Sequence, residues 1–190
     1  MQTLSLWLQK MTESFENLAI DLKEIPSAQE GDYQKIEPAY RKVAIIGWSI
    51  LFLIYLIVMP IIFYFNDETQ DEPIFIYASI ALGLFLWGMN ILWVNAAFKK
   101  KKYMLRQKDL IYTKGLLWSK RTTIPFNRIQ HAEVKQGPLE RMFKLHNLKV
   151  FTAGGSSSDL SIPGLTEDNA SRMKEYILNK IEEEEIKDEH

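Results

Sequence analysis

Cysteine is absent from the chain, and this absence removes several kinds of chemistry at once. Without thiols the protein has no disulfides, no thiolate ligands for a metal and no cysteine nucleophile. A cysteine-free chain also suits a reducing compartment such as the cytoplasm. Its stability must therefore come from packing and hydrogen bonding rather than from cross-links.

Charged residues are missing from two long stretches, residues 43–65 and 74–98. A helix rises about 1.5 Å per residue and the hydrocarbon core of a bilayer is about 30 Å thick, so about 20 apolar residues span it. Both stretches are longer than this, and buried helices of soluble proteins seldom stay uncharged over such a length. The sequence therefore predicts two membrane spans within a hairpin at 36–102.

The charges around the two stretches predict how the hairpin is oriented. The loop at 66–73 is acidic and holds no lysine or arginine. The basic residues that flank the other ends are Arg41, Lys42, Lys99, Lys100, Lys101 and Lys102. Positive residues stay on the cytoplasmic side of a membrane. We therefore expect a multi-pass protein with the loop outside and both termini in the cytoplasm.

Aspartate, glutamate, lysine, arginine and histidine are absent from the interior of both stretches, which argues against transport by this chain alone. Ion pathways and proton relays use such groups within the membrane. Asn90 and Asn95 are the strongly polar residues at depth, and Asn95 lies near the cytoplasmic end. An amide in the apolar core can hydrogen-bond to another helix. Asn90 is therefore our candidate for helix association.

Residues 1–25 show the apolar spacing of an amphipathic helix. The apolar positions, three and four residues apart, are Leu4, Leu8, Met11, Phe15, Leu18 and Leu22. This helix could lie on the membrane surface, pack on the chain's own soluble domain or pair with a second copy. Its acidic polar face favours packing against another helix. Residues 26–33 have the composition of a linker, so 1–35 form an N-terminal piece.

After Tyr103 the pattern changes to that of strands. Residues 109–126 and 127–137 are rich in β-branched and aromatic residues with polar residues between them. In the first of these segments we place a turn at residues 118–119, with 114–115 as the alternative. The domain that begins here is expected to cover 103–182.

The second half of this domain is expected to contain a helical turn, two strands and a helix. Residues 138–145 begin with proline, as short helices often do, and residues 147–153 alternate as a strand. The Gly/Ser-rich segment at 154–158 should connect to a return strand that ends at Pro163 and Gly164.

The chain's last segment predicts a helix and an acidic tail. Thr166 is suited to cap a helix over 167–182 whose apolar stripe covers the sheet. The acidic tail at 183–190 opposes the helix dipole, so we expect it to fray.

Antiparallel strands followed by one C-terminal helix are the layout of pleckstrin-homology (PH) domains. The segments 128–130, 136–141 and 152–165 resemble the bacterial PH family of the YdbS-like type, in which two membrane helices precede the domain. The resemblance covers about residues 40–182. It implies a two-helix transmembrane hairpin plus an α+β PH-like domain, an antiparallel β-sandwich or barrel capped by the C-terminal helix. It also implies a non-enzymatic binding or assembly domain at a bacterial cytoplasmic (inner) membrane.

Basic residues supply the candidate binding site, because residues 99–152 are strongly basic although the whole chain has a net charge of −1. The candidates for contact with a lipid headgroup or a partner are Lys99, Lys100, Lys101, Lys102, Arg106, Arg128, Lys135 and Arg141. Each basic residue near an anionic leaflet contributes about 1 kcal/mol. The four lysines also have the simpler role of orienting the hairpin, and the last three residues could equally satisfy loops and sheet edges.

The function we expect is binding and assembly, with a second copy or with a membrane-protein partner. Direct recognition of anionic phospholipid is the alternative, and an accessory role in a transport or enzyme complex is a further one. The histidines His131, His146 and His190 lack the spacing of metal ligands, and no nucleic-acid motif is present. We therefore expect no catalytic residue, cofactor, metal or nucleic acid. The loop at 154–158 matches no nucleophile elbow or P-loop, although its backbone could hold an anion.

Overall fold

The computed structural model describes residues 32–66, 68, 72–153 and 159–188. The helix predicted for residues 1–25 and the connection at 154–158 lie outside these residues, so both stay predictions. Residues from Tyr33 onward form one unit by their internal contacts, and the description below concerns this unit.

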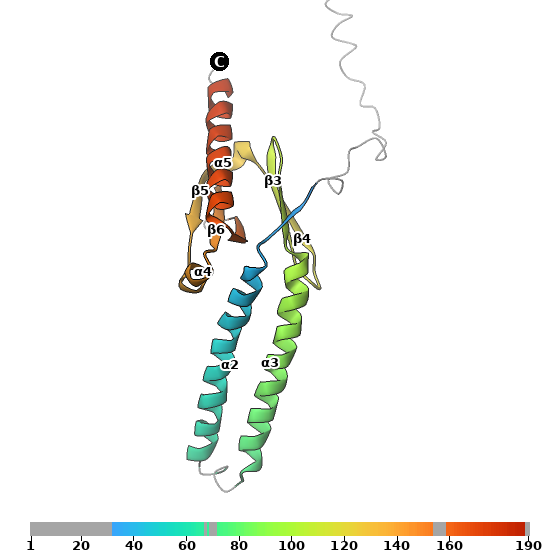
Figure 1. The fold of residues 1–190 in the computed structure, drawn as a ribbon. Coiled ribbons are helices and arrows are strands. Elements are labelled where there is room, and N and C mark those ends of the chain that lie inside the picture. Colours follow the sequence, from blue (N-terminus) through green and yellow to red (C-terminus); the bar gives the residue numbers. More distant parts are fainter. Residues whose placement is uncertain (1–31, 67, 69–71, 154–158, 189–190) are drawn as a thin grey trace, which may run out of the picture. The chain divides into compact units, whose positions relative to one another are not determined.

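Two long helices, α2 (Ala39–Phe65) and α3 (Ile74–Lys100), contain both uncharged stretches in full. Each is long and apolar enough to cross a membrane. Figure 1 shows them side by side, joined at one end as a hairpin. Many of their large apolar side chains are exposed, as is usual for helices that face lipid rather than water. The predicted transmembrane hairpin is confirmed.

The two helices approach closely around Gly83, which is buried. A Cβ at this position would lie 2.7 Å from Cε1 of Tyr55 and 2.8 Å from Cδ2 of Leu56. Trp87 Nε1 donates a hydrogen bond to Ser49 Oγ across the same interface at 3.0 Å. By contrast, a Cβ at Gly88 would meet no atom within 4 Å. Of these two glycines, Gly83 is therefore the one that lets the helices pack.

The first sheet contains four antiparallel strands in the order β1-β2-β3-β4. These are β1 (Gln34–Lys35), β2 (Lys102–Leu105), β3 (Asp109–Lys114) and β4 (Lys120–Pro125). The hairpin therefore lies between two hydrogen-bonded neighbours, because β1 precedes α2 and β2 follows α3. Ile36, directly after β1, is 2% exposed and belongs to the core of the soluble domain. The sequence did not predict this arrangement, since we assigned residues 34–35 to the N-terminal piece and residue 36 to the hairpin.

The second sheet contains three antiparallel strands in the order β5-β6-β7. They are β5 (Ile129–Lys135), β6 (His146–Thr152) and β7 (Leu160–Leu165). A 3₁₀ turn, η1 (Phe126–Arg128), leads from β4 to β5, and the short helix α4 (Pro138–Met142) leads from β5 towards β6.

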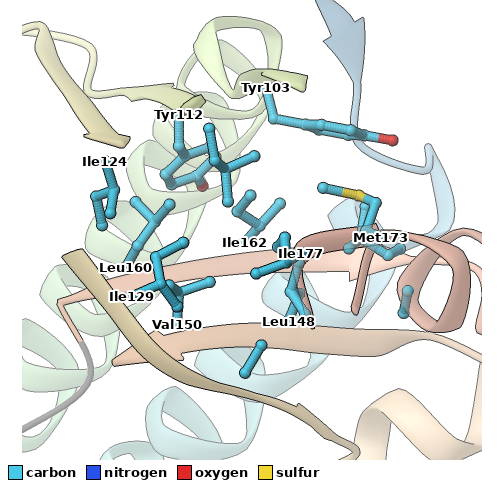
Figure 2. Close-up of a cluster of buried hydrophobic side chains, with 14 of the residues drawn as sticks. Tyr103, Tyr112, Ile124, Ile129, Leu148, Val150, Leu160, Ile162, Met173 and Ile177 are labelled. Atoms are coloured by element: carbon cyan, nitrogen blue, oxygen red, sulfur yellow. The ribbon is translucent and has the colours of Figure 1, made fainter. Parts of the chain in front are cut away.

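The C-terminal helix α5 (Glu167–Asp188) packs on β5, β6 and η1. Figure 2 shows buried side chains from both sheets and from this helix in one cluster. Its members include Tyr103, Tyr112, Leu148, Val150, Ile162, Met173 and Ile177. Two antiparallel sheets and one capping helix around a shared core confirm the predicted PH-like architecture.

Two predictions about the C-terminal helix can be compared with the structure. Thr166 caps α5 as predicted, because its Oγ1 accepts a hydrogen bond from the backbone N–H of Asn169 at 3.2 Å. The expected end of this helix at residue 182 was wrong, since α5 continues to Asp188. Glutamate is a good helix former, and Lys180 pairs with Glu183 along the helix, which offsets the unfavourable dipole.

The strand ends also differ in two places. Pro163 and Gly164 lie within β7 rather than ending it, and Pro163 is tolerated because β7 is an edge strand. The β3–β4 connection covers residues 115–119, since Lys114 pairs with Lys120. Both turn positions that we considered therefore fall in or next to one five-residue loop.

Candidate functional site

The membrane hairpin joins the soluble domain through very short connections. Only Lys101 stands between α3 and β2, and its backbone N–H donates to the carbonyl oxygen of Phe98 at 3.1 Å. On the other side, the backbone N–H of Glu37 donates to the carbonyl oxygen of Gly164 at 2.8 Å. Both ends of the hairpin are thus fixed to the sheets, and the basic residues at these ends hold defined places against the domain.

Tyr40, Lys101 and Gly164 meet where the hairpin joins the domain. Lys101 Nζ lies 4.6 Å from the centroid of the Tyr40 ring and 3.4 Å from the tyrosine hydroxyl, to which it donates. Gly164 has a positive φ of 69°, and a Cβ there would lie 2.7 Å from Cβ of Tyr40. The missing side chain therefore gives Tyr40 the space to lie under the lysine, where the ring face attracts the cation.

A cavity of about 190 Å³ lies between α2 and α3 at the ends that carry the basic residues. The residues that line it are Tyr40, Arg41, Ala44, Trp48, Trp93, Val94, Ala97, Phe98 and Lys101. Aromatic and aliphatic side chains supply most of this lining, and Arg41 and Lys101 supply two cations near the domain. Basic pockets between membrane helices suit the headgroups of anionic lipids, whose chains continue along the apolar walls.

The two cations of the cavity have no carboxylate partner in the part of the chain that the structure describes. Burial lowers the pKa of Lys101 below its usual range, and repulsion from Lys114 lowers it further. An anion beside Lys101 would oppose both effects, because attraction favours the charged form of the amine. The local electrostatics therefore favour an anionic ligand.

The four predicted lysines at the end of α3 have different surroundings. Lys99 and Lys100 are exposed in the last turn of the helix. Lys101 lines the cavity, and Lys102 Nζ lies 4.0 Å from the centroid of the Tyr33 ring. All four are adjacent to the membrane hairpin, and their role in binding stays a prediction.

Arg106 and Arg128 lie at the end of the sheets away from the hairpin. Arg106 follows β2, and its Nε donates to Oδ1 of Asp109 at 2.6 Å across the β2–β3 turn. Arg128 belongs to η1, which is held beside this turn by a hydrogen bond from the backbone N–H of Phe126 to the carbonyl oxygen of Lys108. The structure therefore does not bring these two arginines together with the lysines.

Lys135 and Arg141 lie on either side of the start of α4. Lys135 Nζ is 2.7 Å from a carboxylate oxygen of Glu133, and this contact lowers the pKa of that carboxyl. Arg141 is exposed, and its helix packs against α2. Of the two, Lys135 has a carboxylate partner, and Arg141 has none among the described residues.

Residues 41–181 match the sequence profile of the family described as the bacterial PH domain. The chain belongs to this family. Its relatives include the UPF0699 transmembrane protein YdbT of Bacillus subtilis (strain 168), 27% identical over 126 residues, which are 65% of this chain and 25% of YdbT. The UPF0699 transmembrane protein YdbS of the same organism is 26% identical over 87 residues, which are 45% of this chain and 53% of YdbS.

The chain thus spans about a quarter of the length of one curated relative and about half of the other. No solved structure matches it significantly. Family membership and the two relatives support a bilayer as the setting of this bacterial PH domain.

The motif residues that carried the family resemblance close turns in this PH domain. Gln136 Nε2 donates to the carbonyl oxygen of Leu145 at 3.0 Å. Asn147 Nδ2 donates to Oε1 of Glu140 at 2.6 Å, and the other oxygen of this carboxylate accepts the backbone N–H of Gly137. These side chains therefore have a structural role in holding α4 between β5 and β6.

Asn90 has no hydrogen-bond partner in the described part of the PH protein. Asn95, in contrast, donates from Nδ2 to the carbonyl oxygen of Ile91 within its own helix at 2.8 Å. An unpaired amide in hydrocarbon is costly. Asn90 therefore stays a candidate for contact with another helix.

Sequence reasoning missed two features of this PH protein. Arg41 was read as an orienting charge only, and Tyr40 carried no signal of its own. Trp118 was assigned to a turn and Leu117 was given no role, although the run of three bulky apolar residues at 116–118 is unusual in a turn.

Proposed function

We propose that this chain is a non-enzymatic binding and assembly module at the cytoplasmic face of a bacterial cytoplasmic membrane. The hairpin loop lies outside, and both termini lie in the cytoplasm. The basic residues in the first turn of α2 and the last turn of α3 support this orientation. Membership of the bacterial PH domain family supports a binding role.

The ligand that the geometry supports best is the headgroup of an anionic phospholipid. The observation that carries this proposal is the cavity between α2 and α3, with Arg41 and Lys101 in an otherwise largely apolar lining. Both cations lack an acidic partner among the described residues. A phosphate would satisfy them, and the lipid chains would follow the helices into the bilayer.

Native mass spectrometry of the full chain, extracted from membranes of mixed lipid composition, tests this proposal. We expect phosphatidylglycerol to be retained in preference to phosphatidylethanolamine. The exchange of both Arg41 and Lys101 for glutamine should remove this preference. The matched control exchanges Lys99 and Lys100 for glutamine, which removes the same charge from exposed positions. An equal loss in both double variants would contradict a specific site and leave only diffuse attraction.

Assembly with a second copy is the second candidate, and the unpaired amide of Asn90 favours it. Two such amides on neighbouring copies could hydrogen-bond to each other within the membrane. We expect Asn90→Leu to lower the fraction of dimer or higher oligomer in crosslinking of native membranes, while Asn95→Leu leaves it unchanged. A wild-type chain that stays monomeric in membranes would refute this candidate.

A further inference from the structure

The loop at residues 115–119 lies at the end of the first sheet to which the membrane hairpin is attached. Lys102 is the first residue of β2 after α3, and it pairs with Thr113 near the end of β3. The β3–β4 loop follows directly, because Lys114 pairs with Lys120. Because β3 runs antiparallel to β2, this loop lies at the end of the two strands that is next to the junction of β2 with α3.

The tip of this loop carries two large apolar side chains with almost no cover. Leu117 is 68% exposed and Trp118 is 85% exposed. Gly115 holds the loop closed, because its φ is +106° and a Cβ there would lie 1.9 Å from the carbonyl oxygen of Trp118. The two side chains therefore belong to a tight turn whose backbone conformation requires glycine at position 115.

The helix α4 packs against α2, the other helix of the hairpin, and carries a further exposed apolar side chain, Met142. Leu139 Cδ1 would lie 3.6 Å from a Cβ at Gly47. Gly47 belongs to the uncharged stretch of α2, so α4 reaches the level of the membrane span. Met142 of the same short helix is 75% exposed.

Both apolar tips are accompanied by exposed basic residues. Lys114, Lys120 and Arg121 flank the loop that carries Trp118, and Arg141 and Lys144 flank Met142. Tryptophan and other amphipathic groups favour the headgroup region of a bilayer, and cations beside them attract anionic lipid. An apolar tip between cations has the chemistry of a membrane-inserting loop, and a bilayer must surround the adjacent helices in any case.

We propose that Leu117–Trp118 and Met142 enter the interface of the cytoplasmic leaflet, one beside α3 and the other beside α2, and seat the PH domain on the bilayer at two points. The proposal rests on the proposed function in one respect, namely that the basic ends of the hairpin face that leaflet. It differs from it in naming a surface that contacts bulk lipid, independently of any lipid held in the cavity.

The absence of cysteine makes a direct test possible, because single cysteines can be introduced and spin-labelled without further changes. Labels at Leu117→Cys and Met142→Cys leave Trp118 in place. The full chain is reconstituted in bilayer nanodiscs of phosphatidylethanolamine with phosphatidylglycerol. Relaxation of the label by lipid-soluble oxygen is compared with relaxation by a water-soluble nickel complex. The matched control is Gln107→Cys, which is exposed in the β2–β3 turn at the opposite end of the same sheet.

We expect oxygen to dominate at positions 117 and 142 and the nickel complex to dominate at position 107. Water exposure at 117 and 142 equal to that at 107 would overturn the proposal. A further label at Leu92→Cys, on the lipid-facing surface of α3, reports whether the hairpin itself is inserted. If position 92 is in lipid while positions 117 and 142 are in water, the proposed contact of these two sites with the bilayer is refuted, although the hairpin is inserted in the membrane.

A second measurement uses the native side chain. Brominated lipids quench tryptophan fluorescence by contact, and the difference in quenching between the wild type and Trp118→Phe isolates Trp118 from the other tryptophans. Quenching that falls in Trp118→Phe supports the insertion of this loop, and equal quenching in both proteins contradicts it.

Discussion

Single glycines decide how closely the helices and the domain approach one another. Gly164 allows Tyr40 to lie against β7, and Gly83 allows Tyr55 and Leu56 of α2 to pack against α3. In each case the nearest atoms would lie under 3 Å from an added Cβ, which is shorter than ordinary van der Waals contact. Glycine at these two positions is therefore required by the packing of the neighbouring side chains.

The exchange of Gly83 for leucine should weaken the hairpin. The added side chain must displace Tyr55 and Leu56, and overpacking of this kind costs about 1–3 kcal/mol. Thermal unfolding of the purified chain in detergent measures the effect as a lower Tm. Gly88→Leu is the matched control, because a Cβ there meets no atom within 4 Å. Equal Tm values for the two variants would show that Gly83 does not set the packing.

Lys101 should give the stability of the folded chain a distinctive pH dependence. Its pKa in the folded chain lies below the ordinary value of 10.5 because the amine is buried. The unfolded chain therefore keeps this proton to higher pH, and the stability contributed by Lys101 rises with pH as 10.5 is approached from below.

The Tm difference between the wild type and Lys101→Gln, followed from neutral to alkaline pH, measures this contribution. The wild type should gain relative to the variant as the pH rises. The exposed Lys100→Gln provides the control for a general loss of one positive charge. A difference that stays constant with pH would mean that the Lys101 amine is fully charged and solvated in the folded protein.

At the scale of elements, the short strand β1 makes the segment before the hairpin part of the soluble domain. Its two residues pair with β2, and Ile36 directly after them is buried in the core. Ile36→Ala should therefore lower the stability of the domain by about 2–5 kcal/mol, as truncation of a buried isoleucine does.

Chemical unfolding followed by circular dichroism would register the loss as a lower midpoint. The neighbouring exposed Lys35→Ala provides the control. If Ile36→Ala unfolds at the same midpoint as the wild type, the core does not extend to the segment before the hairpin.

Most elements could be predicted from the sequence because their signals are local. Two uncharged stretches suffice to identify the spans. The β-branched and aromatic content of residues 109–126 and the alternation of residues 147–153 indicated strands. The pairing of β1 with β2 could not be predicted, because two residues carry no period and their partner lies beyond the whole hairpin. The extent of α5 was missed for a different reason, namely that the helix propensity of glutamate outweighed its unfavourable position.

The candidate site was predicted only in part, because some of its features depend on contacts between residues that are distant in the sequence. Lys101 could be named because a run of four lysines after a span is visible in sequence. The cavity that it lines, and the contribution of Arg41, depend on how α2 and α3 pack against each other, which is a matter of tertiary structure. Arg106 was grouped with the lysines by sequence proximity, yet β2 carries it to the other end of the sheet, where it pairs with Asp109.

At the scale of the whole molecule, the hairpin and the PH domain form one structural unit, because the hairpin is inserted between strands β1 and β2 of the domain. Short connections on both sides fix the position of the domain relative to the spans. The resulting arrangement places cations, aromatic side chains and a cavity together where the proposed cytoplasmic leaflet meets the protein. A membrane-anchored module that binds anionic lipid is the account that joins these features.

Photocrosslinking in native membranes tests this account most directly. A diazirine amino acid replaces Ala97, which lines the cavity, and in a second protein it replaces Leu92, which faces the surrounding lipid on the same helix. After irradiation, mass spectrometry identifies the captured lipids. We predict that position 97 captures anionic phospholipid well above its share of the membrane, while position 92 captures lipids in bulk proportion. The same lipid composition at both positions would contradict the account.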